Sequence, residues 1–196
     1  MSDGVHSEEE MKLNQLFLEQ LEVEAKSTRR ALERVPEGKN DWKPHEKSMP
    51  LGYLAALVAK MPGWIAMMVD QDAYDLNAKD ARFQPVALAT NEELVASFDE
   101  AAAAARRALL GTTDEHLQKN WKMLVGGHVV SDAPRYTSIR DAVFTHLGHH
   151  RGQLTVYLRL NEALVCLLRN PKRYCGLGEQ TIGSKQLRRA ARSARK

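Results

Sequence analysis

Hydrophobic side chains recur every three or four residues over four long segments of this 196-residue chain. In an α-helix that spacing places them on one face, which must be buried against another element. The pattern predicts four amphipathic helices near residues 8–35, 50–68, 91–110 and 138–160. Four such helices with mostly short or medium connections predict an all-α four-helix bundle.

Capping and breaking residues mark several helix ends. Ser7 with Glu10, and Thr90 with Glu93, match the capping box in which a hydroxyl and a carboxylate satisfy free backbone amides. We therefore expect helices to begin at both places. The Pro62-Gly63 pair is expected to kink or stop the second helix, because proline removes a helical hydrogen bond.

The segments between the helices carry weaker signals. Residues 70–90 are predicted to form an irregular connection, and a short helix fits residues 113–118. Residues 121–130, with two glycines in the middle, are the strand-like part of the chain, so we expect a small hairpin or an extended arm there.

Composition agrees with a folded domain. Hydrophobic residues make up 43% of the chain, which excludes wholesale disorder. No apolar run approaches 18 residues, so no membrane span is expected. The first ten residues are acidic and polar without the apolar core of a signal peptide, and we therefore expect a cytoplasmic protein.

Charge divides the chain into two parts. Residues 169–196 carry nine Lys or Arg and one acid, which gives them a net charge of +8 and leaves −5 for residues 1–168. We expect a bundle domain over residues 1–165 and a divergent basic C-terminal tail over 166–196. Cys166 and Cys175 do not form a disulfide scaffold, and no paired motif marks either as an activated thiol.

The histidines of the last predicted helix are the best candidates for chemistry. His146 and His150 are four residues apart, so both lie on one helix face, which apolar neighbours direct into the bundle. Two imidazoles at this spacing can bind one divalent ion, or they can be core histidines satisfied by hydrogen bonds. His149 lies on the neighbouring face. A third ligand would come from elsewhere, with His128 and His45 as the candidates.

These residues are also where the chain resembles a known family. The stretch from Phe144 to Leu154, with the form Phe-Thr-His-x3-His-Arg-Gly-Gln-Leu, resembles the last helix of the DinB-like (damage-inducible) superfamily. Further similar stretches are Thr28–Pro36, Asp41–His45, Lys47–Gly52, Pro62–Trp64 and Gly126–His128. The resemblance implies a bundle of up-up-down-down type, often dimeric, with a divalent metal such as zinc or nickel held by three histidines. Characterised relatives include transferases and isomerases that use low-molecular-weight thiols.

Carried over residue by residue, the resemblance makes His146 and His150 two metal ligands. The family's first ligand lies a few residues before the Pro-Gly-Trp element, where this chain has Leu57. Leucine has no lone pair to donate, so the usual three ligands are reduced to two. Arg151 is expected to pair with an acid on a neighbouring helix, and Gln153 to bond the backbone or a ligand histidine.

Three functions stay open at this point. The first is a divalent-metal-dependent thiol transferase with an incomplete histidine triad, for which no catalytic residue is assigned. The second is a non-catalytic bundle that binds a small ligand or a partner, and Leu57 favours it over metal-dependent catalysis. The third is polyanion binding through the basic tail, although no recognition motif accompanies the charge and we expect no specific nucleic-acid binding. A homodimer is expected, with no membrane partner.

Overall fold

The computed structural model describes residues 11–78, 85–163 and 165. The predicted capping box at Ser7 and Glu10, the basic tail and both cysteines lie outside this part of the chain. The main helices are α1 (Leu13–Leu32), α2 (Leu51–Lys60), α3 (Gly63–Asp70), α4 (Asn91–Gly111) and α7 (His146–Leu160). Shorter elements are α5 (Asp114–Gln118), α6 (Arg135–Ile139), the π-helix η1 (Arg140–Thr145), and strands β1 (Ala73–Asp75), β2 (Asn120–Val125) and β3 (His128–Pro134).

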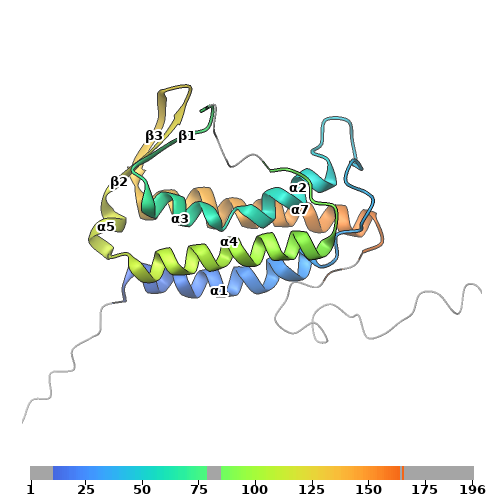
Figure 1. Cartoon of the computed structure of the whole chain (residues 1–196), viewed down its shortest axis with the longest axis horizontal. Coiled ribbons are helices and arrows are strands. Elements are labelled where there is room, and N and C mark those ends of the chain that lie inside the picture. The colour runs from blue at the N-terminus through green and yellow to red at the C-terminus, as the bar shows by residue number, and fades with distance from the viewer. Residues whose placement is uncertain (1–10, 79–84, 164, 166–196) are drawn as a thin grey trace, which may run out of the picture. The chain divides into compact units, whose positions relative to one another are not determined.

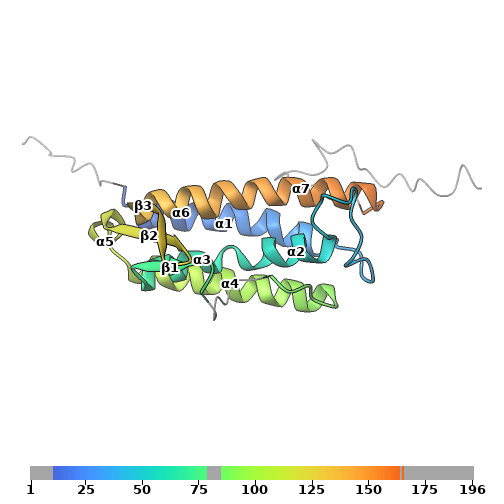
Figure 2. The same cartoon turned by 90° about the horizontal axis from the view of Figure 1, so that it is seen from above.

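The helices form a four-helix bundle in which α2 and α3 together make one arm, as predicted (Figure 1). Figure 2 shows α7 and α4 on opposite sides, with α2 and α3 between them. Side chains that join neighbouring arms are Glu22–Arg106 and Arg29–Asp99 for α1 and α4, Glu24–Arg151 for α1 and α7, and Trp64–His146 for α3 and α7. The bundle core therefore lies between these four arms.

The direction of the arms differs from the expected order. Figure 1 shows α1 and α7 running one way and α2–α3 and α4 running the other, so the order is up-down-down-up and the up-up-down-down order was wrong. The reason is the loop over residues 33–50, which folds back on the start of α2 through the bond from Gly52 N to Asn40 O. Asn40 also donates to Leu88 O, which brings the start of α4 to the same end of the bundle.

Helix ends follow local chemistry at one place and tertiary contacts at another. The capping box of Thr90 and Glu93 begins α4, as predicted. In contrast, α1 begins at Leu13 and not near residue 8, because the carboxylate of Asp114 accepts from the Leu13 amide at 3.0 and 3.1 Å. The second predicted helix is interrupted at Pro62, where α2 and α3 meet at a bend of 48°.

The strand-like segment forms an antiparallel hairpin of β2 and β3, as predicted. The connection over 70–90 is less irregular than expected, because β1 pairs with β2 in parallel. The carboxylate of Asp75 fixes this arrangement by accepting from the amides of Gly126 and Gly127 at 2.9 and 2.6 Å. Both glycines have positive φ, at 59° and 83°, which a tight hairpin turn requires. Because β1 has three residues, it is too short to show the alternation of apolar and polar side chains that predicts a strand.

The buried core of the described residues is mainly apolar. No single helix of the described residues is long and apolar enough to cross a membrane; the bent pair α2 and α3 passes by length and composition together. Most side chains of α2 are buried inside the bundle, including Leu51, Leu54 and Val58. Burial against the other helices explains why α2 and α3 are so apolar.

Candidate histidine site

The last arm of the bundle changes its helical geometry just before the histidines. Residues Arg140–Thr145 form a π-helix, and α7 follows from His146 without a break. A π-helical turn is wider than an α-helical one, and such turns are frequent at functional sites. Here Val143, Phe144 and Leu147 are buried in the core, so the face that carries His146 and His150 turns towards α2 and α3.

The structure brings the two predicted histidines together. The ring centroids of His146 and His150 lie 4.4 Å apart, and the ring of Trp64 lies 6.1 Å from that of His146. His150 is 8% exposed, whereas His149 is exposed and its ring lies 6.4 Å from that of His146. The pair therefore faces α3, and His149 points to the adjacent outer face as the sequence indicated.

Hydrogen bonds orient both imidazoles. Nδ1 of His150 lies 2.7 Å from Oε1 of Gln153, and because an amide oxygen only accepts, Nδ1 is the donor in this hydrogen bond. The ring of His146 bonds to the backbone of Ala142 in the turn before it. A histidine ligand to a metal usually has its second ring nitrogen held in this way. Of the two partners expected for Gln153, the backbone or a histidine of the pair, the structure shows His150.

Electrostatics keeps His146 neutral. Burial lowers the pKa of His146 below its ordinary value of 6.5, and the neighbouring His150 and His149 lower it further, against an opposing effect of the Ala142 hydrogen bond. Burial removes water from the charged form, and the nearby imidazoles repel a second positive charge. A neutral imidazole is the form that binds a metal ion.

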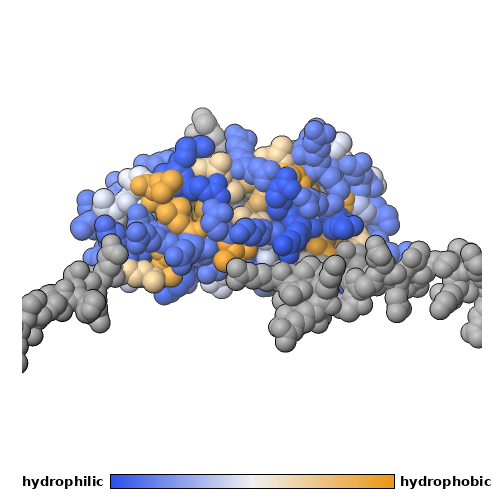
Figure 3. All heavy atoms as spheres, turned by 90° about the horizontal axis from the view of Figure 1, so that it is seen from below, coloured by the Kyte–Doolittle hydropathy of each residue, from blue (hydrophilic) through white to orange (hydrophobic). Residues whose placement is uncertain are grey.

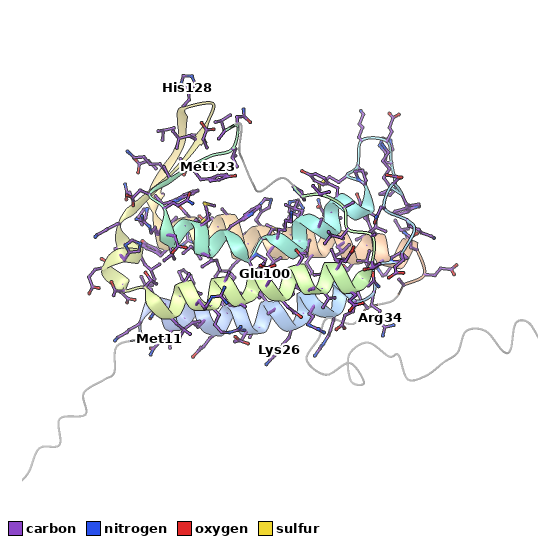
Figure 4. The ribbon with its side chains drawn as sticks, viewed as in Figure 1. Met11, Lys26, Arg34, Glu100, Met123 and His128 are labelled. Atoms are coloured by element: carbon purple, nitrogen blue, oxygen red, sulfur yellow. The ribbon has the colours of Figure 1, made fainter. Side chains whose placement is uncertain are left out.

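The candidate third ligands do not reach the pair. Figure 4 shows the side chain of His128 at the outer tip of the β2–β3 hairpin, pointing away from the helices. His45 is exposed, and its Nδ1 accepts from the amide of Lys47. Within residues 11–78, 85–163 and 165, no group of three His, Cys, Asp or Glu side chains is arranged to hold a metal ion. The pair fits two positions of a metal site, and a three-histidine centre does not fit the described residues.

Leu57 lies at the level of the pair along the bundle. The arm of α2 and α3 runs antiparallel to α7. At one end of their contact the hydroxyl of Tyr157 donates to Met49 O, just before α2, and at the other end the ring of Trp64 lies beside that of His146. Leu57 is eight residues after Met49 and seven before Trp64, so it lies near the middle of that contact along the bundle. It is 8% exposed, so an apolar side chain is buried there.

Arg151 has the structural role predicted for it. Its guanidinium pairs with the carboxylate of Glu24 and donates to Thr28 Oγ1 at 2.9 Å, both on α1. Thr28 is fully buried, as its place on the apolar face of the first helix indicated. The side chain points to α1, whereas the histidines point to α3, so Arg151 supports the helix packing from the opposite side.

The described helices form a four-helix bundle that carries the histidine pair on its last arm. A crystal structure of a DinB-like protein of Bacillus subtilis, YjoA, matches this chain with a TM-score of 0.58 and 17% sequence identity, over 75% of this chain and 92% of that one. Sequence profiles of known families give no match, and neither do curated protein sequences. The DinB-like resemblance is thus confirmed at the level of the fold.

Proposed function

We propose that His146 and His150 form a weak divalent-metal site, with zinc or nickel as the ion. The observation that carries the proposal is the bond between Nδ1 of His150 and Gln153, which leaves Nε2 free and oriented. The low pKa of His146 supports it, because that imidazole is neutral and available at pH 7. Such an ion, when bound, lowers the pKa of a coordinated water or thiol, which is the chemistry that thiol transfer needs.

A second function is favoured by Leu57. With an apolar, buried side chain at the level of the pair, the bundle would keep its fold without metal chemistry and bind a small ligand or a partner. In that case the two imidazoles are core groups that are satisfied by Gln153 and by the backbone of Ala142. The two functions differ in one measurable property, which is metal binding by the pair.

Titration calorimetry with zinc and with nickel chloride, on the full chain without an affinity tag, tests the proposal. We expect one ion per chain, and a loss of affinity of about tenfold or more in His150→Ala, because one of two ligands is removed. The matched control is His45→Ala, which removes an exposed histidine outside the pair and should leave the affinity unchanged. Equal affinities of the parent and His150→Ala would contradict the proposal.

A further inference from the structure

We propose that a hollow at the start of α1 binds a small organic ammonium ion, which donates hydrogen bonds to side chains that have no donor among the described residues. The hollow has a volume of about 450 Å³, within the range of small-molecule sites. It lies where the start of α1 meets the segment that joins α4 to α5, at one end of the bundle (Figure 1). None of the described residues that line it belongs to the histidine pair, so this inference goes beyond the proposed function.

The hydroxyl of Thr112 is the first argument. Thr112 lines the hollow and is 8% exposed, and its Oγ1 has no hydrogen-bond partner within residues 11–78, 85–163 and 165. A buried hydroxyl without a partner destabilises the folded state, so such groups are rare in native proteins. Rotation about the Cα–Cβ bond exchanges the positions of the hydroxyl and the methyl group. The hydroxyl can therefore serve a group that enters the hollow.

The amide of Asn14, which lines the same hollow, is the second argument. Its Nδ2 donates to Leu109 O and Thr112 O at 3.3 and 3.4 Å. These bonds fix the orientation of the amide, because the reverse orientation would set its oxygen against two carbonyl oxygens. Oδ1 of Asn14 therefore faces away from them, and it is buried without a donor among the described residues. An amide oxygen only accepts, so the group that completes it must be a donor.

The charge around the hollow favours a cation. Its lining carries the carboxylates of Asp114 and Glu115 against one cation, Lys12. Hydrogen bonds from its own backbone amide and from the Thr113 side chain, together with Lys12, hold the pKa of Glu115 below its ordinary value of 4.5, so this carboxylate is charged at pH 7. The positive end of α1 already has its anion, because Asp114 accepts from the Leu13 amide. An ammonium group supplies both a positive charge and three N–H donors.

The experiment is an NMR titration of the isotope-labelled full chain at constant ionic strength, followed through the backbone amide signals of residues 112–115. The probe is propylammonium chloride. Tetramethylammonium chloride is the comparison, because it carries the same charge without an N–H group. We expect propylammonium to shift these signals saturably with a Kd of about 1 mM. Tetramethylammonium should bind at least about tenfold more weakly, because it cannot donate to Asn14 or Thr112.

Thr112→Val separates ligand binding from stability. Valine keeps the shape of the side chain and suits the extended backbone after α4, but it removes the hydroxyl. Propylammonium should therefore bind about tenfold more weakly to this variant. The Tm of the variant without ligand should be unchanged or higher, because a buried polar group without a partner is removed.

Charge variants test the sign of the ligand. Glu115→Gln removes one carboxylate and should weaken propylammonium binding about threefold, whereas Lys12→Ala removes a competing cation and should strengthen it about threefold. The matched control is Glu100→Gln, because Glu100 is exposed on α4 outside the hollow and should not affect binding.

Each contrary outcome overturns the proposal. The absence of a saturable shift with propylammonium would show that the hollow holds no ammonium ion. Equal binding of tetramethylammonium would refute the role of the two free acceptors. If Thr112→Val binds propylammonium as tightly as the parent, or loses both binding and Tm, the hydroxyl does not serve a ligand. These results are independent of metal binding at the histidine pair.

Discussion

At the scale of single residues, the hydrogen-bond partners of the histidines determine what the pair can do. Gln153 fixes the tautomer of His150, and the surroundings of His146 keep its ring neutral. Neither effect is a property of histidine itself, because both depend on groups within one helical turn and on burial. The same rings on a solvent-exposed helix would titrate near their ordinary pKa and rotate freely.

The stability of the protein should depend on pH through His146. The pKa of His146 is lower in the folded chain than its ordinary value of 6.5 in the unfolded chain. Below pH 6.5 the unfolded chain therefore binds more protons than the folded chain, and acidification favours unfolding. The contribution is fully present above pH 6.5 and is lost as the pH falls through the lower pKa of the folded state. Urea unfolding at several pH values on both sides of 6.5 measures this. In His146→Gln the loss of stability on acidification should be smaller; an identical pH dependence would contradict the assignment.

Replacement of Arg151 should destabilise the bundle. Arg151→Met removes the ion pair with Glu24 and the bond to Thr28, and it leaves a partly buried carboxylate unpaired, since these side chains are 14% and 17% exposed. Hydrogen bonds to charged groups contribute roughly 1.5–3 kcal/mol, which is the expected loss in urea unfolding. Arg140→Met is the control, because the Arg140–Asp141 pair is exposed and should give no measurable change. Equal effects of the two substitutions would refute this role of Arg151.

At the scale of elements, one buried arginine joins the small sheet to the bundle. Arg135 is 1% exposed and donates to the carbonyls of Met68 and Gln71 at the end of α3, and to that of Asn120 at the start of β2. The last carbonyls of a helix have no partner within it, so the guanidinium satisfies groups that would otherwise be orphaned. Its fork of donors suits this task, and lysine offers no comparable geometry.

Arg135→Met should therefore be among the most destabilising substitutions in the chain. Several buried carbonyls would lose their donor, and we expect a loss of about 3 kcal/mol or more in urea unfolding. The control is Asp72→Asn, because the Asp72 side chain that pairs with Arg135 is 95% exposed and should contribute little. A large effect of Asp72→Asn with a small one of Arg135→Met would show that the ion pair, and not the carbonyls, holds the junction.

The hairpin edge offers little for pairing with another chain. In β3, Ser131 pairs with Met123 and Val129 with Leu124, which leaves Val130 as a bulge in the strand. Bulges and prolines at a sheet edge disrupt the row of free backbone groups, and β3 ends at Pro134. The exposure of Val129 and Val130 is therefore insufficient to make this edge a strand-addition site.

At the scale of the bundle domain, exposed large apolar side chains lie on several elements, and two of them share one side of α1. Figure 3 shows the face that carries α1 and α4 as largely hydrophilic with small hydrophobic patches. Leu16 and Val23 are seven residues apart on α1 and are 45% and 63% exposed, and Val156 of the neighbouring α7 is 43% exposed. Glu22 and Arg29, which pair with α4, lie on another side of α1. Leu16 and Val23 therefore form an exposed apolar side of α1.

We expect a homodimer that uses this side of α1. Light scattering at micromolar concentration should give twice the mass of the chain, and Val23→Lys should shift it towards the monomer, because a charge would be buried in the contact. The control is Val129→Lys, the same change at a 53% exposed valine of the hairpin, away from α1. A monomeric mass of the parent would contradict the expectation, and a dimer unaffected by Val23→Lys would place the contact elsewhere.

Periodicity and capping were sufficient for the helices, including the interruption at Pro62 and the start of α4 at its capping box. They failed for α1, where Asp114 from a distant segment replaces the local cap, and for β1, which exists because β2 lies beside it. In the site, the spacing of His146 and His150 predicted a shared face, and the motif predicted Gln153 as a partner. No pattern in the sequence predicted the role of Arg135, because an arginine near the start of a helix is usually exposed on the surface.

The sequence by itself determined most of the helices and the common face of the two histidines, because each depends on spacing within one segment. Tertiary structure decided the up-down-down-up order, the burial that lowers the pKa of His146, and the separation of His45 and His128 from the pair. These properties depend on distances between segments far apart in the chain. Such distances are set by how the loops return and how the arms pack, which no local pattern of side chains specifies.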